Sequence, residues 1–184
     1  MMQLENEYGS YGEDKEYLKT LYELMLELGV KVPIFTSDGA WKAAQEAGTM
    51  TDFDILTTGN FGSRSKENFK SLKEFHESKE KKWPLMCMEY WGGWFNRWSD
   101  PIIKRDAQDL TNDVKEALEM GSLNLYMFHG GTNFGFMNGC SARLGKDLPQ
   151  LTSYDYDAPL NEQGNPTKKY DSLQKMMKES FPGI

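Results

Sequence analysis

The sequence has few cysteines, no excess of basic residues and no long apolar run. Two cysteines are too few for a disulfide framework, and Cys87, which lies in an apolar stretch, is expected to be a buried structural thiol. A formal net charge of −7 argues against nucleic acid as a partner, because phosphate binding needs a basic face. Since the chain holds no run of about 18 apolar residues, we expect no membrane span.

Several motifs of cofactor and metal chemistry are also missing from the sequence. Its two histidines and two cysteines do not have the spacing of zinc ligands, so we expect no metal site. The glycine-rich stretch at residues 130–135 lacks the Gly-Lys-Ser/Thr ending of a phosphate loop. The nucleophile elbow of serine and cysteine hydrolases is absent as well. The sequence therefore predicts a reaction that needs no cofactor.

What the sequence does have is acids at the ends of apolar stretches. Glu5 and Glu7 follow an apolar lead-in, and read as a strand they share one face. A second apolar stretch ends on Glu89, followed by Trp91 and a Gly-Gly loop. Burying an unpaired carboxylate is very costly, so these acids fit strands that open into a solvated pocket. Two carboxylates beside aromatic rings are what glycosidic bond cleavage requires.

Apolar periodicity predicts that strands alternate with helices along the whole chain. The expected strands are residues 1–6, 31–35, 54–57, 84–88 and 123–128, and the expected helices are 14–28, 41–47, 67–80, 102–120 and 167–178. This alternation is typical of βα units around a parallel sheet, either doubly wound or closed into a barrel. The barrel is favoured because polar residues follow nearly every strand, where barrels place their active sites.

Four blocks carry a more specific signal: residues 5–11, 88–94, 124–135 and 152–160. In sequence, order and rough spacing they resemble glycoside hydrolase family 35, the β-galactosidases. The resemblance implies a (β/α)8 TIM barrel, of which this chain supplies the end of strand 4 through strand 8 and the final helix. Residues 1–184 would then be the C-terminal half of one catalytic barrel, with no second domain, since a complete barrel needs eight strands and about 250 residues.

The resemblance also assigns the two acids their roles. Glu7 would be the general acid/base and Glu89 the nucleophile, rather than surface carboxylates. Because the family retains anomeric configuration, their carboxyl groups are expected about 5–5.5 Å apart. Asn6 is expected to bind the sugar 2-hydroxyl, the alternative being a turn-forming asparagine.

Three aromatic residues complete the predicted site. Tyr126 lies at the exit of the last expected strand and is expected beside Glu89, although a barrel-core tyrosine would also fit this position. Tyr156 matches a substrate-contacting tyrosine of the family. Trp91 matches an aromatic position near the nucleophile, where the family also uses tyrosine.

The predicted activity is removal of terminal non-reducing β-D-galactose through a covalent galactosyl-enzyme intermediate. The expected partner is a β-galactoside oligosaccharide or glycoconjugate. One alternative is another exo-β-glycosidase such as a β-glucosaminidase, and a second is a non-catalytic carbohydrate-binding fragment. Half a barrel exposes open sheet edges, so the chain alone is expected to be inactive and to self-associate. Its location is left open between the cytoplasm and the cell surface of a bacterium-like host.

Overall fold

The structure, a computed structural model, describes residues 1–143 and 145–183. The chain forms two compact units. Unit 1 contains residues 1–90 and 117–124, and unit 2 contains residues 91–116 and the chain from residue 125 onward. Each unit is described by itself below.

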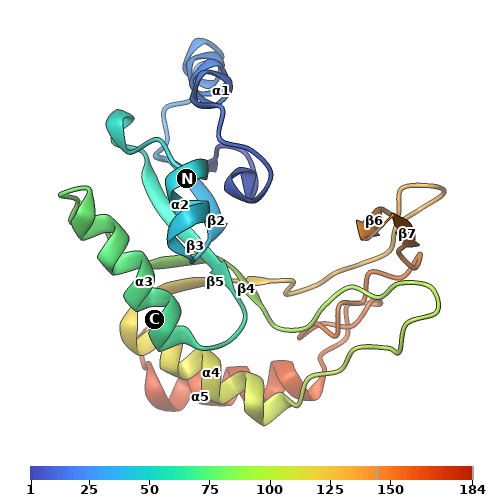
Figure 1. The fold of residues 1–184 in the computed structure, drawn as a ribbon. Helices are drawn as coiled ribbons and strands as arrows, with labels where there is room; N and C mark the ends of the chain where they lie inside the picture. The colour runs from blue at the N-terminus through green and yellow to red at the C-terminus, as the bar shows by residue number, and fades with distance from the viewer. Residues whose placement is uncertain (144, 184) are drawn as a thin grey trace. The chain divides into compact units, whose positions relative to one another are not determined.

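A parallel sheet organises unit 1, and its strands lie side by side in the order β1-β2-β3-β4-β5 (Figure 1). The strands are β1 (Met2–Gln3), β2 (Ile34–Gly39), β3 (Leu56–Phe61), β4 (Met86–Trp91) and β5 (Ser122–Tyr126). The spatial order equals the chain order, whereas a doubly wound sheet reverses direction at a switch point. Five parallel strands alternating with helices are thus consistent with part of a TIM barrel.

The helices that alternate with these strands are α1 (Lys15–Glu27), α2 (Lys42–Gly48), α3 (Ser65–Ser78), α4 (Ala107–Met120) and α5 (Lys168–Ser180). Helix α1 begins where the Asp14 side chain accepts hydrogen bonds from two backbone N–H groups of its first turn. It ends before Gly29, as predicted, and Gly29 has a φ of +86° that favours glycine. Short 3-10 turns lie at Tyr8–Ser10 (η1) and Thr51–Phe53 (η2).

Two clusters of apolar side chains form the core of unit 1 and hold α1 and α3 against the strands. One cluster joins α1 to the strands and contains Leu4, Leu18, Met50 and Ile55. In a second cluster Phe61 packs edge-to-face on Phe69 of α3, with ring centroids 5.0 Å apart, and on Tyr90 at 5.8 Å. Cys87 is fully buried and free, and burial raises the pKa of its thiol to about 12. The prediction of a buried structural thiol is confirmed.

The strands β2 and β3 lie further along the chain than predicted, which corrects the ranges 31–35 and 54–57. Each strand runs on through polar residues that are buried inside the sheet. Thr58 donates its hydroxyl to the Thr36 carbonyl at 2.9 Å, and Ser37 donates to Asn60 at 2.5 Å. A prediction from apolar runs stops too early here, because side-chain hydrogen bonds take the place of apolar packing.

Helix α4 is shorter than predicted because it begins at Ala107 and not at residue 102. The carboxylate of Asp106 accepts hydrogen bonds from the N–H groups of Gln108 and Asp109, which is the geometry of an N-cap. These bonds hold the pKa of Asp106 below its usual value. The cap therefore fixes the start of the helix, and the apolar residues just before it stay outside.

In unit 2 the segment predicted as one long loop, residues 129–165, contains an antiparallel hairpin. Its strands are β6 (Cys140–Arg143) and β7 (Lys146–Pro149), with Cys140 opposite Pro149 and Ser141 opposite Leu148. The hairpin shows no strict apolar alternation in sequence, so the pattern gave no signal for it. Among the described helices of both units, none combines the length and apolar character needed to cross a bilayer.

Candidate active site

Glu7 lies just beyond the carboxyl end of β1. The backbone stays hydrogen-bonded to β2 after the strand ends, through Leu4 N–H to the Phe35 carbonyl at 2.8 Å and Glu7 N–H to the Ser37 carbonyl at 2.9 Å. Glu7 itself has φ 51° and ψ 31°, in the left-handed region that non-glycine residues rarely occupy. Such a conformation costs about 1–3 kcal/mol and is found most often at functional sites.

Asn60 joins the two predicted catalytic positions within unit 1. Its side-chain Nδ2 donates to Glu7 Oε1 at 3.2 Å, and its Oδ1 accepts from the backbone N–H of Glu89 at 3.1 Å. The sheet register places Asn60 directly opposite Glu89. Asn60 of β3 thus contacts both Glu7, which lies just beyond β1, and Glu89, which lies in β4, although β2 and β3 separate these two strands in the sheet. The catalytic roles of Glu7 and Glu89 and the expected separation of about 5–5.5 Å between their carboxyl groups stay predictions. Asn60 was not among the predicted site residues.

The exit of β2 adds a third acid close to Glu7. Asp38 is buried, and its Oδ1 accepts a hydrogen bond from the Gly9 N–H at 2.8 Å. Burial is the main cause that raises the pKa of Asp38 to about 6, and the negative charge of Glu7 adds to it, while the Gly9 N–H opposes the change. Asp38 therefore gains or loses its proton near neutral pH, which is unusual for an aspartate.

The residues around Glu7 do not follow strand alternation, so the expectation that Glu5 and Glu7 share a face is wrong. β1 ends at Gln3, and Glu5 has a φ of 58°. The Glu5 carboxylate accepts from the Tyr17 hydroxyl at 2.6 Å and from the Asn6 N–H at 3.1 Å, which fixes the turn that presents Glu7. Asn6 is exposed, and its Oδ1 accepts from Gln3 Nε2 at 2.9 Å. Its contact with a sugar hydroxyl stays a prediction.

The three predicted aromatic residues belong to one ring cluster in unit 2. Tyr126 packs edge-to-face on Tyr156, with centroids 5.6 Å apart. Trp91 packs edge-to-face on Trp94 at 5.2 Å, and Trp94 in turn lies 6.1 Å from Tyr156. Tyr154 lies 5.5 Å from Tyr156 and extends the cluster. Trp94 and Tyr154 were not among the predicted site residues, although both lie in the family-like blocks.

A buried lysine links two segments of unit 2 next to this cluster, the residue that follows β4 and the loop that contains Asp157. Lys169 of α5 donates to the Gly92 carbonyl at 2.8 Å, to the Asp157 carbonyl at 2.7 Å and to the Asp157 carboxylate. Burial acts to raise the pKa of Asp157, but hydrogen bonds from Lys169 and from the Arg105 N–H outweigh it and hold that pKa below its usual value. A Cβ atom on Gly93 would lie 1.8 Å from the Tyr156 carbonyl oxygen, so only glycine fits there.

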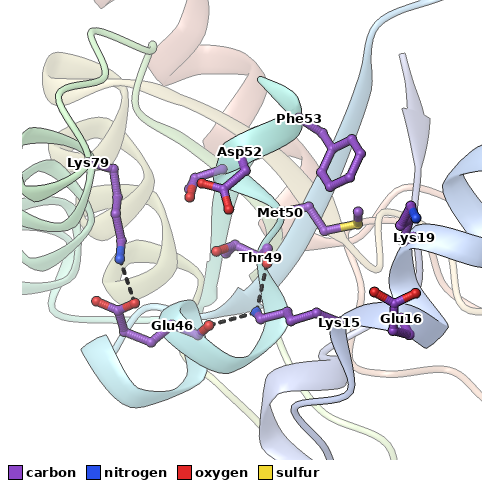
Figure 2. A pocket seen from close by; sticks show the side chains of 10 residues that line it. Lys15, Glu16, Lys19, Glu46, Thr49, Met50, Asp52, Phe53 and Lys79 are labelled. Atoms are coloured by element: carbon purple, nitrogen blue, oxygen red, sulfur yellow. Dashed lines mark hydrogen bonds and ion pairs between the residues drawn. The ribbon is translucent and has the colours of Figure 1, made fainter.

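A separate pocket of about 510 Å³ lies between the start of α1, the end of α2 and η2 (Figure 2). Its lining includes neither Glu7 nor Glu89. Lys15 Nζ donates to the carbonyls of Glu46, Ala47 and Thr49 at 2.7–2.8 Å, and Lys79 pairs with the Glu46 carboxylate at 2.7 Å. Cations suit the carbonyl-rich end of a helix, so Lys15 caps α2, whereas Lys79 makes an ion pair with a side chain of that helix.

Within residues 1–143 and 145–183 the structure contains no group of three or more His, Cys, Asp or Glu residues placed to hold a metal ion. The described donors nearest the predicted acids are instead hydroxyl, amide and backbone groups. Among these groups, the Asn60 amide donates to the Glu7 carboxylate, and the Glu89 backbone N–H donates to Asn60 Oδ1.

Comparison with known proteins places these features in a family. The chain matches glycosyl hydrolases family 35 over residues 1–180. It is 42% identical over 176 residues to human Beta-galactosidase-1-like protein 3, covering 95% of this chain and 26% of that protein. It is 38% identical over 186 residues to Beta-galactosidase 17 of Arabidopsis thaliana, covering 97% and 26%. It is 42% identical over 175 residues to the Beta-galactosidase of Xanthomonas manihotis, covering 92% and 28%.

The chain thus spans about a quarter of the length of the curated relatives it matches. The family match nevertheless covers nearly all of its residues, including the Glu7, Glu89, Tyr126 and Tyr156 positions. The sequence blocks that suggested the resemblance all fall inside the matched range. This chain belongs to glycosyl hydrolases family 35.

Proposed function

We propose that the protein containing this chain is a retaining β-galactosidase that removes terminal non-reducing β-D-galactose from oligosaccharides or glycoconjugates. The observation that carries the proposal is the bridge through Asn60, which ties the Glu7 carboxylate to the backbone of Glu89 inside unit 1. Family membership and the β-galactosidase names of the relatives support galactose as the sugar. A pair of carboxylates that flanks the scissile bond is the arrangement that glycosidic cleavage requires.

In the first step Glu7 donates its proton to the glycosidic oxygen while the Glu89 carboxylate attacks the anomeric carbon. The bond from that carbon to the leaving oxygen breaks, and a galactosyl ester of Glu89 forms. In the second step the Glu7 carboxylate takes a proton from water, and the water oxygen attacks the anomeric carbon. The ester bond breaks, galactose leaves with its original anomeric configuration, and both carboxyl groups return to their starting states.

The sugar contacts are assigned to the residues predicted from the sequence. Asn6 would bind the 2-hydroxyl, a contact that strengthens in the transition state. Tyr126 and Trp91 would supply aromatic surface for the apolar face of the galactose ring, and Tyr156, which is 1% exposed, would support Tyr126 through their ring contact. Their mutual packing in one cluster supports this assignment, because rings that hold each other in place give a rigid surface for a ligand.

We also propose that residues 1–184 supply strands 4 to 8 and the final helix of the barrel, with strand 4 represented by its end. The five-stranded parallel sheet that alternates with helices supports this, since that pattern is consistent with part of a TIM barrel. The 184 residues alone would then hydrolyse substrate poorly and self-associate through open strand edges.

The test uses the whole polypeptide that contains this chain, assayed with nitrophenyl β-D-galactoside and nitrophenyl β-D-glucosaminide. The proposal predicts a clear preference for the galactoside and release of β-galactose as the first product seen by NMR. Release of α-galactose first would contradict the retaining mechanism. A preference for the glucosaminide would instead support the alternative exo-β-glucosaminidase activity.

A further inference from the structure

The amide of Asn60 has only one orientation that satisfies its neighbours. Its Oδ1 accepts two hydrogen bonds, from the Glu89 N–H at 3.1 Å and from the Ser37 hydroxyl at 2.5 Å. A flipped amide would place its NH2 group against the Glu89 N–H, and two donors would then face each other. Asn60 is 2% exposed, so water cannot relieve that clash. The NH2 group must therefore point to Glu7, where Nδ2 lies 3.2 Å from Oε1.

A neutral donor is the kind of partner that a general acid/base needs. When Glu7 is ionised, its Oε1 accepts from the amide as a carboxylate oxygen. When Glu7 carries its proton on Oε2, Oε1 is a carbonyl oxygen and still accepts the same bond. A lysine or arginine here would favour the ionised form alone, and a second carboxylate would repel it. The Asn60 amide thus holds one oxygen of Glu7 in both halves of a catalytic cycle and leaves the other oxygen for the substrate.

The Asn60 side chain also sets the position of Glu7 relative to Glu89. Gly59 pairs with Cys87 and Asn60 pairs with Glu89, so Met88 is an extra residue in β4. Bulges of this kind re-aim side chains next to active sites. Here the extra residue brings the Glu89 N–H opposite Asn60 Oδ1. One buried amide therefore joins the exits of three strands, β2 through Ser37, β3 through itself and β4 through Glu89.

From these contacts we propose that Asn60 is a positioning residue for the acid/base Glu7 and that Ser37 fixes the orientation of its amide. The inference rests on the proposed glycosidase function and adds a residue to its machinery. A purely structural role, in which Asn60 only satisfies buried groups of the sheet, would also explain its burial. The two roles differ in which kinetic quantities change when the donated hydrogen bond is removed.

The test is Asn60→Asp in the whole polypeptide, because the new carboxylate keeps both accepted hydrogen bonds, loses the donated one and adds a negative charge beside Glu7. The matched control is Asn68→Asp on α3, where the amide donates to the Ser63 carbonyl and is not part of the bridge. Values of kcat/KM are measured for a β-galactosyl disaccharide, which needs protonation of its leaving group. They are also measured for 2,4-dinitrophenyl β-galactoside, whose phenolate leaves unaided.

The proposal predicts that Asn60→Asp lowers kcat/KM about 10- to 100-fold for the disaccharide and less than about 3-fold for the dinitrophenyl substrate. The alkaline limb of the pH–rate profile for the disaccharide is expected to move to higher pH, because the added negative charge holds the proton of the acid more tightly. Asn68→Asp is expected to leave both rates and the profile unchanged.

Equal losses on both substrates with an unchanged pH profile would overturn the proposal and leave Asn60 a structural residue. Ser37→Ala provides a second variant in case Asn60→Asp does not fold, since it removes one hydrogen bond to the amide and adds no charge. Ser37→Ala is expected to lower kcat/KM more for the disaccharide than for the dinitrophenyl substrate, by a smaller factor than Asn60→Asp does. An equal loss of kcat/KM on both substrates would again overturn the proposal. If the unaltered protein hydrolyses neither substrate, the proposed function fails, which is a separate result.

Discussion

Replacing Asp38 by asparagine tests the electrostatics of the candidate site. Asp38 is 1% exposed and lies at the exit of β2, with the Gly9 N–H bonded to its Oδ1 at 2.8 Å. An asparagine has nearly the same shape and keeps an oxygen for that hydrogen bond. The substitution therefore removes the buried charge with little change in packing, and we expect it to stabilise the protein above neutral pH.

The size of this expected stabilisation follows from the pKa of Asp38, which burial raises from 3.8 to about 6. Each pKa unit corresponds to about 1.4 kcal/mol, so the ionised carboxylate costs the folded state on the order of 3 kcal/mol. The native state binds this proton more tightly than the unfolded state, so its contribution to stability falls as pH rises from about 4 to about 6. Asp38→Asn is expected to abolish this loss.

The assay is urea unfolding of the whole polypeptide at pH 4.5 and pH 8, with and without Asp38→Asn. The free energy gained by the variant is expected to be larger at pH 8 than at pH 4.5 by on the order of 2–3 kcal/mol. Asp52→Asn, at an exposed carboxylate of the same unit, serves as the control and is expected to show no such difference. An equal effect of Asp38→Asn at both pH values would refute the reasoning.

Three further substitutions test the rest of the account. Glu7→Gln is expected to lower kcat/KM for alkyl β-galactosides by about 10²- to 10⁴-fold and to lower kcat/KM for dinitrophenyl β-galactoside far less. Steady-state kinetics measure both values. Equal losses of kcat/KM on the two substrates would show that Glu7 is not the general acid. Glu89→Gln is expected to remove most activity on every substrate, so unchanged turnover would exclude it as the nucleophile. Lys169→Met removes the closest cation of the partly buried Asp157 carboxylate, which keeps its contacts with Lys104 and the Arg105 N–H. The substitution is expected to lower the free energy of unfolding in urea by about 3 kcal/mol, and a loss below about 1 kcal/mol would contradict this.

The sequence predicted the main features of the fold and the two acids of the site. Apolar periodicity located all five strands of the sheet and all five long helices, because each buries a regular apolar face. Glu7 and Glu89 were predicted as the two acids because each follows an apolar run and is accompanied by a recognisable motif, and their catalytic roles stay predictions. The strand exits were misplaced by several residues, since Ser37 and Asn60 are buried through hydrogen bonds that apolar patterns do not register.

Other features depend on contacts between distant residues and could not be predicted from local patterns. The link from Asn60 to Glu7 needs the β2–β3 and β3–β4 registers, which local periodicity does not specify. The position of Glu5 was wrong because the chain leaves strand geometry after Gln3, where positive φ values replace alternation. Lys169 reads in sequence as one more charge on an amphipathic helix, yet it is 4% exposed and pairs with Asp157.

The most direct test of the central claim is to trap the covalent intermediate in the whole polypeptide with a 2-deoxy-2-fluoro-β-galactoside carrying an activated leaving group. Such a substrate forms the glycosyl-enzyme ester faster than water releases it, so the ester accumulates. The account predicts that mass spectrometry of the digested protein finds the sugar on the peptide containing Glu89. A sugar attached to any other residue, or turnover of the parent galactoside that releases α-galactose first, would contradict it.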